Sequence, residues 1–398
     1  MRIIGVIEND FSAGGGYFQG LNAIIQMNDI CIKNGITFEV VVFSESAISF
    51  FEEKNIIVTH FKKTIFDRMI HQIFSVSIVQ TLIELFKFNW IYPIERKFNY
   101  LTPDLLYFIS PSSVPLYLKK INFIYTVWDL CHRDFPEFPE VRNSVFHLRE
   151  NKYKYILPFA SLIVVDSEVT KNNIAKYYGV SKERVLELPF SPNPFLSKNS
   201  KNNLVDSLAK LCINHNFIFY PAQFWPHKNH ISILKAIKIL NNQGIKINVV
   251  FVGGNKGNKQ NINNFISRNK LSNQVKIFDF VTSKELNLLY SGCSAVIMPS
   301  FFGPTNLLPL EAWYFNKPII YSDLFFEQVQ NAAILVNPFS PQSIAEGILD
   351  SMNEKIRGNV IREGTSRLEF MEIEIKTAIK KIENHILKYR ELKDNWSI

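Results

Sequence analysis

Cysteine is scarce in this sequence, and its few copies are spread out. The 398 residues include four cysteines, and none of them forms a C-x-x-C pair. A zinc knuckle or a disulfide scaffold needs clustered or paired cysteines, so neither is expected. Isolated cysteines are typical of proteins in a reducing compartment, which predicts a cytoplasmic location. The four are Cys31, Cys131, Cys212 and Cys293.

Glycine, proline and charge of one sign are also limited. Glycine and proline contribute 16 and 18 residues and 47% of the chain is hydrophobic, which excludes disordered and collagen-like sequences. Lysine and arginine outnumber aspartate and glutamate by 44 to 36, but no run of five like charges occurs. A nucleic-acid groove usually needs such a run, so we expect no nucleic-acid partner. The excess of positive charge still suits a phosphorylated small molecule or an anionic lipid surface.

A long uninterrupted hydrophobic run is missing as well. The first ten residues, MRIIGVIEND, contain too few apolar residues for the core of a signal peptide. The most apolar long stretch, residues 69–86, is interrupted by strongly polar side chains, so we expect no membrane-spanning helix there. Any contact with a membrane is therefore predicted at its surface. The interrupting residues are His71, Gln72, Gln80 and Glu84.

The sequence does contain a repeated alternation of strand-length apolar runs with segments of helical spacing. This alternation is typical of parallel sheets built from βαβ units. Because 398 residues exceed what one hydrophobic core usually organises, we expect an α/β protein with two doubly wound sheets, one in each half. The runs are residues 2–8, 36–43, 105–111, 123–129 and 161–167 in the first half, and 217–222, 247–254, 274–280, 294–300, 317–323 and 332–338 in the second.

A segment rich in proline, serine and asparagine separates the two halves. Residues 191–203 read SPNPFLSKNSKNN and have no apolar periodicity, so we place the hinge there. The expected domains are residues 1–195 and 204–370. A final helix is predicted over residues 371–398, with one apolar face that packs between or against the domains. That face consists of Met371, Ile375, Ala378, Ile379, Ile382, Ile386 and Tyr389.

Three segments that follow predicted strands carry candidate binding residues. In open α/β sheets, ligands bind at the carboxyl ends of the strands, where free N–H groups at helix N-termini favour anions. The first segment, SAGGGY at residues 12–17, has three glycines, which permit close approach to a ligand or form a flexible turn. The second, YPAQFWPHKNH at residues 220–230, places Lys228 at a helix start, where a lysine is suited to clamp a diphosphate.

The third segment, PSFFGPTNLLPLEA at residues 299–312, joins a predicted strand to a helix. Its middle consists of turn formers, from Gly303 to Asn306. Glu311 follows within an apolar helix, where its carboxylate needs hydrogen-bond donors. The diol of a ribose would provide such donors.

Together these segments resemble the retaining glycosyltransferases of family 4, which have the GT-B fold. The resemblance covers most of residues 215–350, including the runs 275–312 and 332–348. In the first half it is carried by the glycine loop and by the runs 123–138 and 164–180. The family implies two Rossmann-like domains that face a central cleft. The first would lie on the acceptor side and the second would bind the nucleotide-sugar.

The resemblance implies roles for individual residues. Lys228 matches the phosphate-binding lysine of the family, and Glu311 matches the second glutamate of its E-x7-E motif, which binds the nucleotide ribose. Gly15 and Gly16 match the loop near the diphosphate and the acceptor. The loop that holds the distal phosphate through its backbone amides is matched by Thr305, Asn306 and Leu307.

The sequence departs from the family at three positions. Gly303 stands where the first glutamate of the E-x7-E motif binds a sugar hydroxyl, and Gln223 stands where a basic residue usually precedes the lysine. Trp128 replaces the histidine that precedes Asp129. These departures leave open a non-catalytic module that binds a sugar nucleotide or scaffolds a partner.

Histidines near these segments are further candidates. His132 follows Asp129 by three residues, so it could replace the missing histidine in acid–base catalysis or be a structural residue. His227 and His230 have the spacing of one helix face, which suits a metal site. No third ligand is evident and no Asp-x-Asp pair occurs, so we expect no metal. The candidate catalytic residues are Lys228, Asp129 and His132.

The resemblance implies a retaining hexosyltransferase that uses a nucleoside diphosphate sugar, needs no cofactor, and glycosylates an acceptor hydroxyl. The expected acceptor is a glycan or a lipid-linked oligosaccharide in cell-surface polysaccharide or lipopolysaccharide assembly. A sugar-nucleotide 2-epimerase is a second alternative.

Residues 62–91 combine basic side chains with helical apolar spacing, which is typical of a core helix or of a helix on an anionic membrane surface, here the inner face of the plasma membrane.

Overall fold

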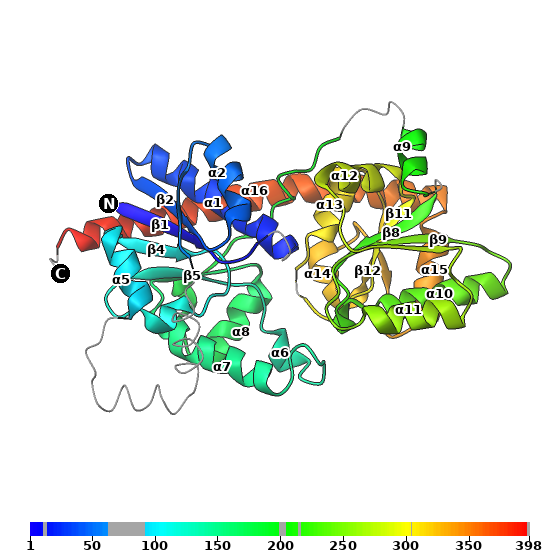
Figure 1. The fold of residues 1–398 in the computed structure, drawn as a ribbon, viewed down its shortest axis with the longest axis horizontal. Helices are drawn as coiled ribbons and strands as arrows, with labels where there is room; N and C mark the ends of the chain where they lie inside the picture. The colour runs from blue at the N-terminus through cyan, green and yellow to red at the C-terminus, as the bar shows by residue number, and fades with distance from the viewer. Residues whose placement is uncertain (11–13, 63–91, 199–203, 214–215, 304, 396–398) are drawn as a thin grey trace. The chain divides into compact units, whose positions relative to one another are not determined.

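The computed structural model describes residues 1–10, 14–62, 92–198, 204–213, 216–303 and 305–395, which form two units (Figure 1). Unit 1 consists of Met1–Pro136, Val141–Pro189 and Glu374–Ile398, and unit 2 of Glu137–Glu140 and Phe190–Ile373. Of the segments singled out in the sequence, residues 63–91, Ser12, Ala13 and Pro304 lie outside the described residues.

Unit 1 is built around a parallel sheet of seven strands in the order β3-β2-β1-β4-β5-β6-β7. Its central strands consist mainly of aliphatic and aromatic residues that are buried on both faces, as is typical of parallel sheets. The strands are β1 (Arg2–Ile7), β2 (Thr37–Val42), β3 (Ile57–His60), β4 (Leu105–Phe108), β5 (Phe123–Val127), β6 (Leu162–Val165) and β7 (Val185–Glu187). The helices are α1 (Gly15–Lys33), α2 (Ile48–Glu53), α5 (Pro93–Tyr100), α6 (Cys131–Asp134), α7 (Ser144–Ile156) and α8 (Glu168–Tyr178).

Unit 2 has a second parallel sheet, of six strands in the order β10-β9-β8-β11-β12-β13. Figure 1 shows α10 and α11 on one face of this sheet and α12 and α13 on the other. The strands are β8 (Phe217–Pro221), β9 (Asn248–Val252), β10 (Val275–Phe278), β11 (Ala295–Met298), β12 (Ile319–Ser322) and β13 (Ile334–Val336). The helices are α9 (Leu204–Lys210), α10 (His230–Asn242), α11 (Lys259–Arg268), α12 (Ser283–Gly292), α13 (Leu308–Tyr314), α14 (Phe326–Val329) and α15 (Pro341–Asp350).

The predicted fold class is confirmed, because every apolar run expected to be a strand contains one. Two strands of unit 1 were not predicted, and both lie at the edges of the sheet. β3 is half exposed and β7 has three residues. Edge strands pair on one side only and are often short, so the apolar runs that encode them are weak.

The units divide between Pro189 and Phe190, earlier in the chain than the predicted boundary at residue 195. Phe190 and Leu196 pack against the hydrophobic core of unit 2. The Leu196 carbonyl also accepts a hydrogen bond from the Tyr314 hydroxyl at 3.3 Å. The beginning of the proline-rich segment is thus attached to unit 2, and residues 199–203 of the predicted hinge lie outside the described residues.

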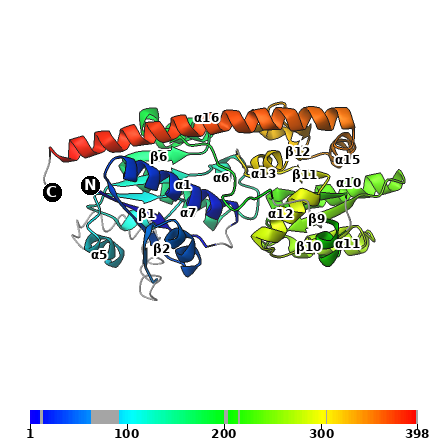
Figure 2. The same ribbon diagram turned by 90° about the horizontal axis from the view of Figure 1, so that it is seen from above.

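Helix α16 (Glu354–Lys393) is one unbroken helix of 40 residues (Figure 2), so the start predicted at residue 371 is too late. The helix belongs to unit 2 as far as Ile373 and to unit 1 from Glu374. In its first part the packed positions include Gly364, where a Cβ would lie 2.3 Å from Trp313 Cδ1. A glycine at a packed position weakens the apolar periodicity, which explains why the sequence did not indicate this part of the helix.

The last part of α16 is anchored on unit 1 by polar contacts and by the apolar face that the sequence predicts. The Glu383 carboxylate accepts hydrogen bonds from Lys33 at 2.9 Å and from Asn34 at 2.8 Å. The Tyr389 hydroxyl donates to the Asp104 carbonyl at 2.9 Å. The buried residues of the predicted face in this part are Ile375, Ala378, Ile382, Ile386 and Tyr389, whereas Met371 packs in the core of unit 2.

Replacing Gly364 by alanine tests the packing of α16 on unit 2. The added methyl group would overlap the buried Trp313 ring, so we expect the free energy of unfolding to fall by about 1–3 kcal/mol in denaturant titrations. Gly358→Ala is the matched control on the same helix, because no atom lies within 4 Å of a Cβ there. Alanine is the better helix former, so this control should gain up to about 1 kcal/mol. Equal gains from both substitutions would contradict the packing.

Candidate active site

The carboxyl ends of β8 and β11 mark the point in unit 2 where the strand order reverses. β8 pairs with β9 on one side and with β11 on the other, so the chain leaving β8 and the chain leaving β11 run in opposite directions across the sheet. Doubly wound sheets bind ligands where such loops diverge. Residues 222–229 and 299–307 follow these strands, and they contain the predicted site residues Gln223, Lys228, Gly303, Thr305, Asn306 and Leu307.

Lys228 is held at both its backbone and its ammonium group. It ends the short 3-10 helix η6 (Pro226–Lys228), and its carbonyl accepts a hydrogen bond from the Tyr220 hydroxyl at 2.9 Å. The next residue, Asn229, has φ 59° and caps α10, while its side chain donates to the carbonyls of Pro299 and Pro338. The ammonium of Lys228 donates to Asn306 Oδ1 at 3.2 Å, which joins the two loops.

Asn306 is the centre of the second loop. Its backbone N–H donates to Gln328 Oε1 at 3.1 Å, and its carbonyl accepts from Gln328 Nε2 at 2.7 Å. Its side-chain amide donates to the Gly303 carbonyl at 3.0 Å and to the Tyr321 hydroxyl at 2.8 Å. The backbone N–H of Asn306, which the resemblance assigns to a phosphate, therefore already donates to Gln328. Asn306 contributes to the site through its side chain, which accepts the hydrogen bond from Lys228. Thr305 is half-buried beside it.

The backbone explains why glycine stands at position 303. Gly303 has φ 110°, a conformation that side chains with a Cβ rarely adopt. A Cβ there would also lie 3.4 Å from the Asn306 side chain. A glutamate, as in the resembling family, would be strained in this loop. Asn306 occupies the neighbouring space instead.

Glu311 is buried in α13, and it already has a hydrogen-bond donor. The Tyr290 hydroxyl, from α12, donates to Glu311 Oε2. Burial raises the pKa of Glu311 to about 7, although the hydrogen bond from Tyr290 lowers it. The donor that a buried carboxylate requires is thus provided within the protein, and Leu307 caps the helix just before Glu311.

Gln223 contacts an aromatic side chain of its own loop. Its Oε1 accepts a hydrogen bond from the Trp225 indole at 3.0 Å, and the Lys256 ammonium lies over that indole ring at 5.6 Å from the centroid. The loop itself passes close to the end of β9. A Cβ on Gly253 would lie 2.2 Å from the Ala222 carbonyl oxygen, so the glycine permits this approach.

The two histidines of this segment point into different surroundings. His230 is fully buried among Tyr220, Phe224 and Phe251, with ring centroids 4.6 to 5.0 Å apart, and burial lowers its pKa to about 3. His227 instead has its Nδ1 at 2.6 Å from a carboxylate oxygen of Glu140. In the described part of the chain, no group of three or more His, Cys, Asp or Glu side chains is arranged to hold a metal ion.

In unit 1 the glycine loop lies at the carboxyl end of β1, next to β4, where the order of this sheet reverses. Gly14 has φ 63° and precedes α1, which begins at Gly15. A Cβ on Gly16 would lie 2.7 Å from two atoms of the Trp128 ring. The close approach that Gly16 permits in this structure is therefore to Trp128, the residue that replaces the histidine of the family.

Asp129 lies at the carboxyl end of β5 and is held as an anion. Its Oδ1 accepts hydrogen bonds from the Cys131 N–H at 3.0 Å and from Arg149 at 2.6 Å. Burial alone would raise the pKa of Asp129, but Arg149 outweighs it and the pKa is lowered. The side chain of Asp129 is still 33% exposed, so it is partly open to solvent.

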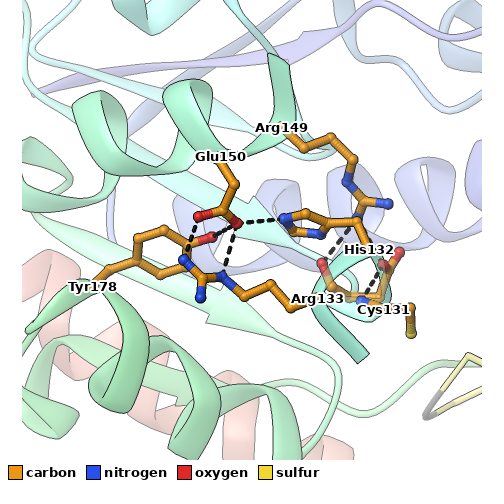
Figure 3. A network of polar contacts seen from close by, with 7 residues as sticks. Cys131, His132, Arg133, Arg149, Glu150 and Tyr178 are labelled. Atoms are coloured by element: carbon orange, nitrogen blue, oxygen red, sulfur yellow. Dashed lines mark hydrogen bonds and ion pairs between the residues drawn. The ribbon is translucent and has the colours of Figure 1, made fainter. Parts of the chain in front are cut away.

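His132 is the fully buried member of a polar network around Glu150 (Figure 3). Its Nε2 lies 2.6 Å from Glu150 Oε1, and the same carboxylate accepts hydrogen bonds from Arg133 at 2.8 Å and Tyr178 at 2.8 Å. Burial lowers the pKa of His132 to about 4, against the effect of Glu150, so the ring is neutral at pH 7. Because the side chain is fully buried, it fixes the position of α6 rather than contacting a substrate directly.

Sequence reasoning did not find the partners of these residues. Gln328 lies on α14, Tyr290 on α12, and both Arg149 and Glu150 on α7. No spacing in the sequence relates these residues to the side chains they contact. The only local signal is the pair of opposite charges at Arg149 and Glu150 inside α7. Such a pair is usually solvent-exposed, so it did not indicate a site.

The raised pKa of Glu311 predicts a pH dependence of stability. Between the ordinary pKa of 4.5 and about 7, the folded state keeps a proton that the unfolded state has lost, so stability falls as pH rises through this range. The variant Glu311→Gln has no carboxyl group to titrate at this position, so it should not lose stability in this way. The free energy of unfolding of Glu311→Gln minus that of the parent should therefore rise by up to about 3 kcal/mol between pH 4.5 and pH 8. Denaturant unfolding of both proteins at the two pH values measures it. If the difference in unfolding free energy between the two proteins did not depend on pH, the raised pKa of Glu311 would be contradicted.

Comparison with known proteins agrees with this arrangement. Residues 210–367 match the family model of glycosyl transferases group 1. The O-antigen chain mannosyltransferase RfbU of Salmonella typhimurium is 28% identical over 185 residues, which are 46% of this chain and 48% of that protein. The chain thus matches about half the length of this curated relative.

Solved structures resemble the chain over nearly its whole length. The structure of HepE from Anabaena in complex with UDP and glucose has a TM-score of 0.72 at 18% identity and covers 97% of this chain and 99% of its own. WaaG, a glycosyltransferase involved in lipopolysaccharide biosynthesis, has a TM-score of 0.62 at 11% identity and covers 96% and 98%. These likenesses confirm the predicted GT-B type of fold. Over residues 210–367, the chain is thus similar to the glycosyl transferases group 1 family.

Proposed function

We propose that this protein is a retaining glycosyltransferase that moves a sugar from a nucleoside diphosphate sugar to an acceptor hydroxyl. The observation that carries the proposal is the ammonium of Lys228, held by Asn306 between the two loops at the strand-order reversal of unit 2. A fixed cation at this point of a doubly wound sheet is suited to a diphosphate. The name of the relative RfbU and the UDP complex of HepE support the same chemistry.

The chemical role of Lys228 follows from where charge develops in the reaction. Transfer breaks the bond between the anomeric carbon and the phosphate oxygen, through an oxocarbenium-like state. Negative charge then grows on the departing diphosphate, and a preorganised cation stabilises it. An ammonium has three donors, so Lys228 can hold Asn306 and a phosphate oxygen together.

The ribose would bind at Glu311. A carboxylate offers several acceptor positions, so it can accept from Tyr290 and from a ribose hydroxyl at the same time. Gln223 and Gly303 stand where the resembling family contacts the phosphate and the sugar. With a neutral Gln223, more of the stabilisation of the diphosphate falls to Lys228.

The acceptor would bind unit 1 at Gly15, Gly16 and the partly exposed carboxylate of Asp129, whose segment is fixed by His132. We propose a glycan or a lipid-linked oligosaccharide in cell-surface polysaccharide or lipopolysaccharide assembly, glycosylated in the cytoplasm at the inner face of an anionic membrane. The basic segment at residues 62–91, proposed to lie on that membrane, is outside the described residues apart from Lys62. None of the helices in the described ranges combines the length and apolarity needed to cross a membrane.

Lys228→Ala tests the assignment of the phosphate contact. We expect a loss of about 10²- to 10³-fold in turnover, by analogy with the loss of one oxyanion donor, with an unchanged melting temperature. The donor is first identified by thermal shift with GDP-, UDP- and ADP-sugars, since a ligand of the folded state raises the melting temperature. Lys235→Ala, an exposed lysine on α10, is the matched control.

The same assay separates the alternatives. Normal turnover in Lys228→Ala would refute the role of the lysine. Donor binding without transfer or hydrolysis by the parent protein would instead favour a non-catalytic module. Conversion of the donor sugar in the absence of any acceptor would favour a 2-epimerase.

Transfer should also proceed without a divalent metal, because Lys228 would neutralise the developing charge on the diphosphate. We expect initial rates in EDTA within about twofold of those in Mg²⁺ or Mn²⁺, by the electrostatic account above. Measuring transfer before and after chelation checks this. Activity that EDTA abolishes and Mn²⁺ restores would contradict it.

A further inference from the structure

A short segment from the first half of the sequence packs within unit 2. Residues Glu137–Glu140 belong to unit 2, although the residues on both sides of them belong to unit 1. The Phe138 ring contacts Phe301 and Phe302 at centroid distances of 5.6 and 5.2 Å. These two phenylalanines directly precede Gly303, so the segment packs on the loop that carries Asn306.

Glu140 is the polar anchor of this segment. Its Oε1 accepts two hydrogen bonds from His227, one from the backbone N–H at 3.0 Å and one involving Nδ1 at 2.6 Å. The side chain of Glu140 is only 6% exposed. Burial alone would raise its pKa, but the contacts with His227 lower it, so Glu140 is ionised at neutral pH.

His227, in turn, connects the two loops of the site. Its ring stacks on Phe302 at 3.9 Å between centroids and 18° between planes. Its carbonyl accepts hydrogen bonds from the Phe301 N–H at 2.9 Å and from the Ser300 hydroxyl at 3.2 Å. The next residue in the chain is Lys228. A shift of the His227 backbone would therefore move the lysine.

We propose that Glu140 is a positioning residue for Lys228: by holding the backbone and the ring of His227, it fixes the ammonium where the diphosphate binds. The proposal rests on the proposed function, since it assumes that Lys228 binds phosphate. A displacement of about 1 Å in a positioned group is enough to lower a rate markedly. A ligand-binding side chain is held in position by neighbouring residues that do not themselves contact the ligand.

The burial of Glu140 argues against a merely structural role. Its second oxygen, Oε2, is buried and has no hydrogen-bond partner in the part of the chain that the structure describes. A buried charge with one unsatisfied oxygen destabilises a fold relative to a well-packed apolar residue. An apolar residue could not make the contact with His227, so this contact accounts for a carboxylate at position 140.

The test is a double-mutant cycle read out by nucleotide binding. The diphosphate used is whichever of GDP, UDP and ADP the parent protein binds most tightly. Calorimetry then measures the affinity of four proteins for this diphosphate and for the matching monophosphate. The four proteins are the parent, Glu140→Ala, Lys228→Ala and the double variant. Glu140→Ala should weaken diphosphate binding about tenfold and leave monophosphate binding nearly unchanged, because Lys228 would contact the distal phosphate. In the Lys228→Ala background it should add little. Glu137→Ala, an exposed glutamate of the same segment, is the matched control.

The outcomes distinguish this proposal from the proposed function. No diphosphate binding by the parent, or no effect of Lys228→Ala, would refute the proposed function. A large effect of Lys228→Ala with no effect of Glu140→Ala, or with additive effects, would overturn only the role of Glu140. If Glu140→Ala does not fold, Glu140→Gln retains an acceptor for the His227 N–H. The affinity of Glu140→Gln for the diphosphate should fall by less than tenfold, and its affinity for the monophosphate should not change. An unchanged affinity of Glu140→Gln for the diphosphate would overturn the proposal.

Discussion

A few hydrogen bonds between two loops determine where the central cation of unit 2 lies. The parallel ladder fixes β8 and β11, but it ends where the loops begin to diverge. Beyond that point, the loops are joined by the contact of Lys228 with Asn306 and by the His227 carbonyl, which accepts from the second loop. Because the β8–β11 ladder does not extend into these loops, the position of a phosphate-binding ammonium depends on the contacts between their side chains and backbones.

In unit 1, a segment that follows a strand is likewise held by side chains, and here these side chains are charged. The segment after β5 is held by α7, whose adjacent residues Arg149 and Glu150 contact different partners. Arg149 keeps the partly exposed Asp129 ionised, whereas Glu150 accepts hydrogen bonds from Arg133 and Tyr178 and contacts the fully buried His132. The partly exposed carboxylate and the buried histidine therefore have different functions, although they are three residues apart.

The sequence predicts the strands and the loops of this protein better than the contacts between them. Central parallel strands are apolar on both faces, so each one leaves a continuous run, while the half-exposed edge strand β3 does not. Turn formers and the lysine likewise indicate the two loops. Tyr290, Gln328 and Glu140 could not be predicted, because their roles depend on tertiary packing that brings distant helices and loops together.

The positions that depart from the resembling family are packed consistently with their neighbours. Gly303 adopts a backbone conformation that excludes a glutamate, and Asn306 occupies the adjacent space and holds the lysine. Trp128 lies against Gly16, where any larger residue would collide with its ring. Each of these two replacements therefore has a local physical reason: the backbone conformation accounts for glycine at position 303, and the Trp128 ring accounts for glycine at position 16.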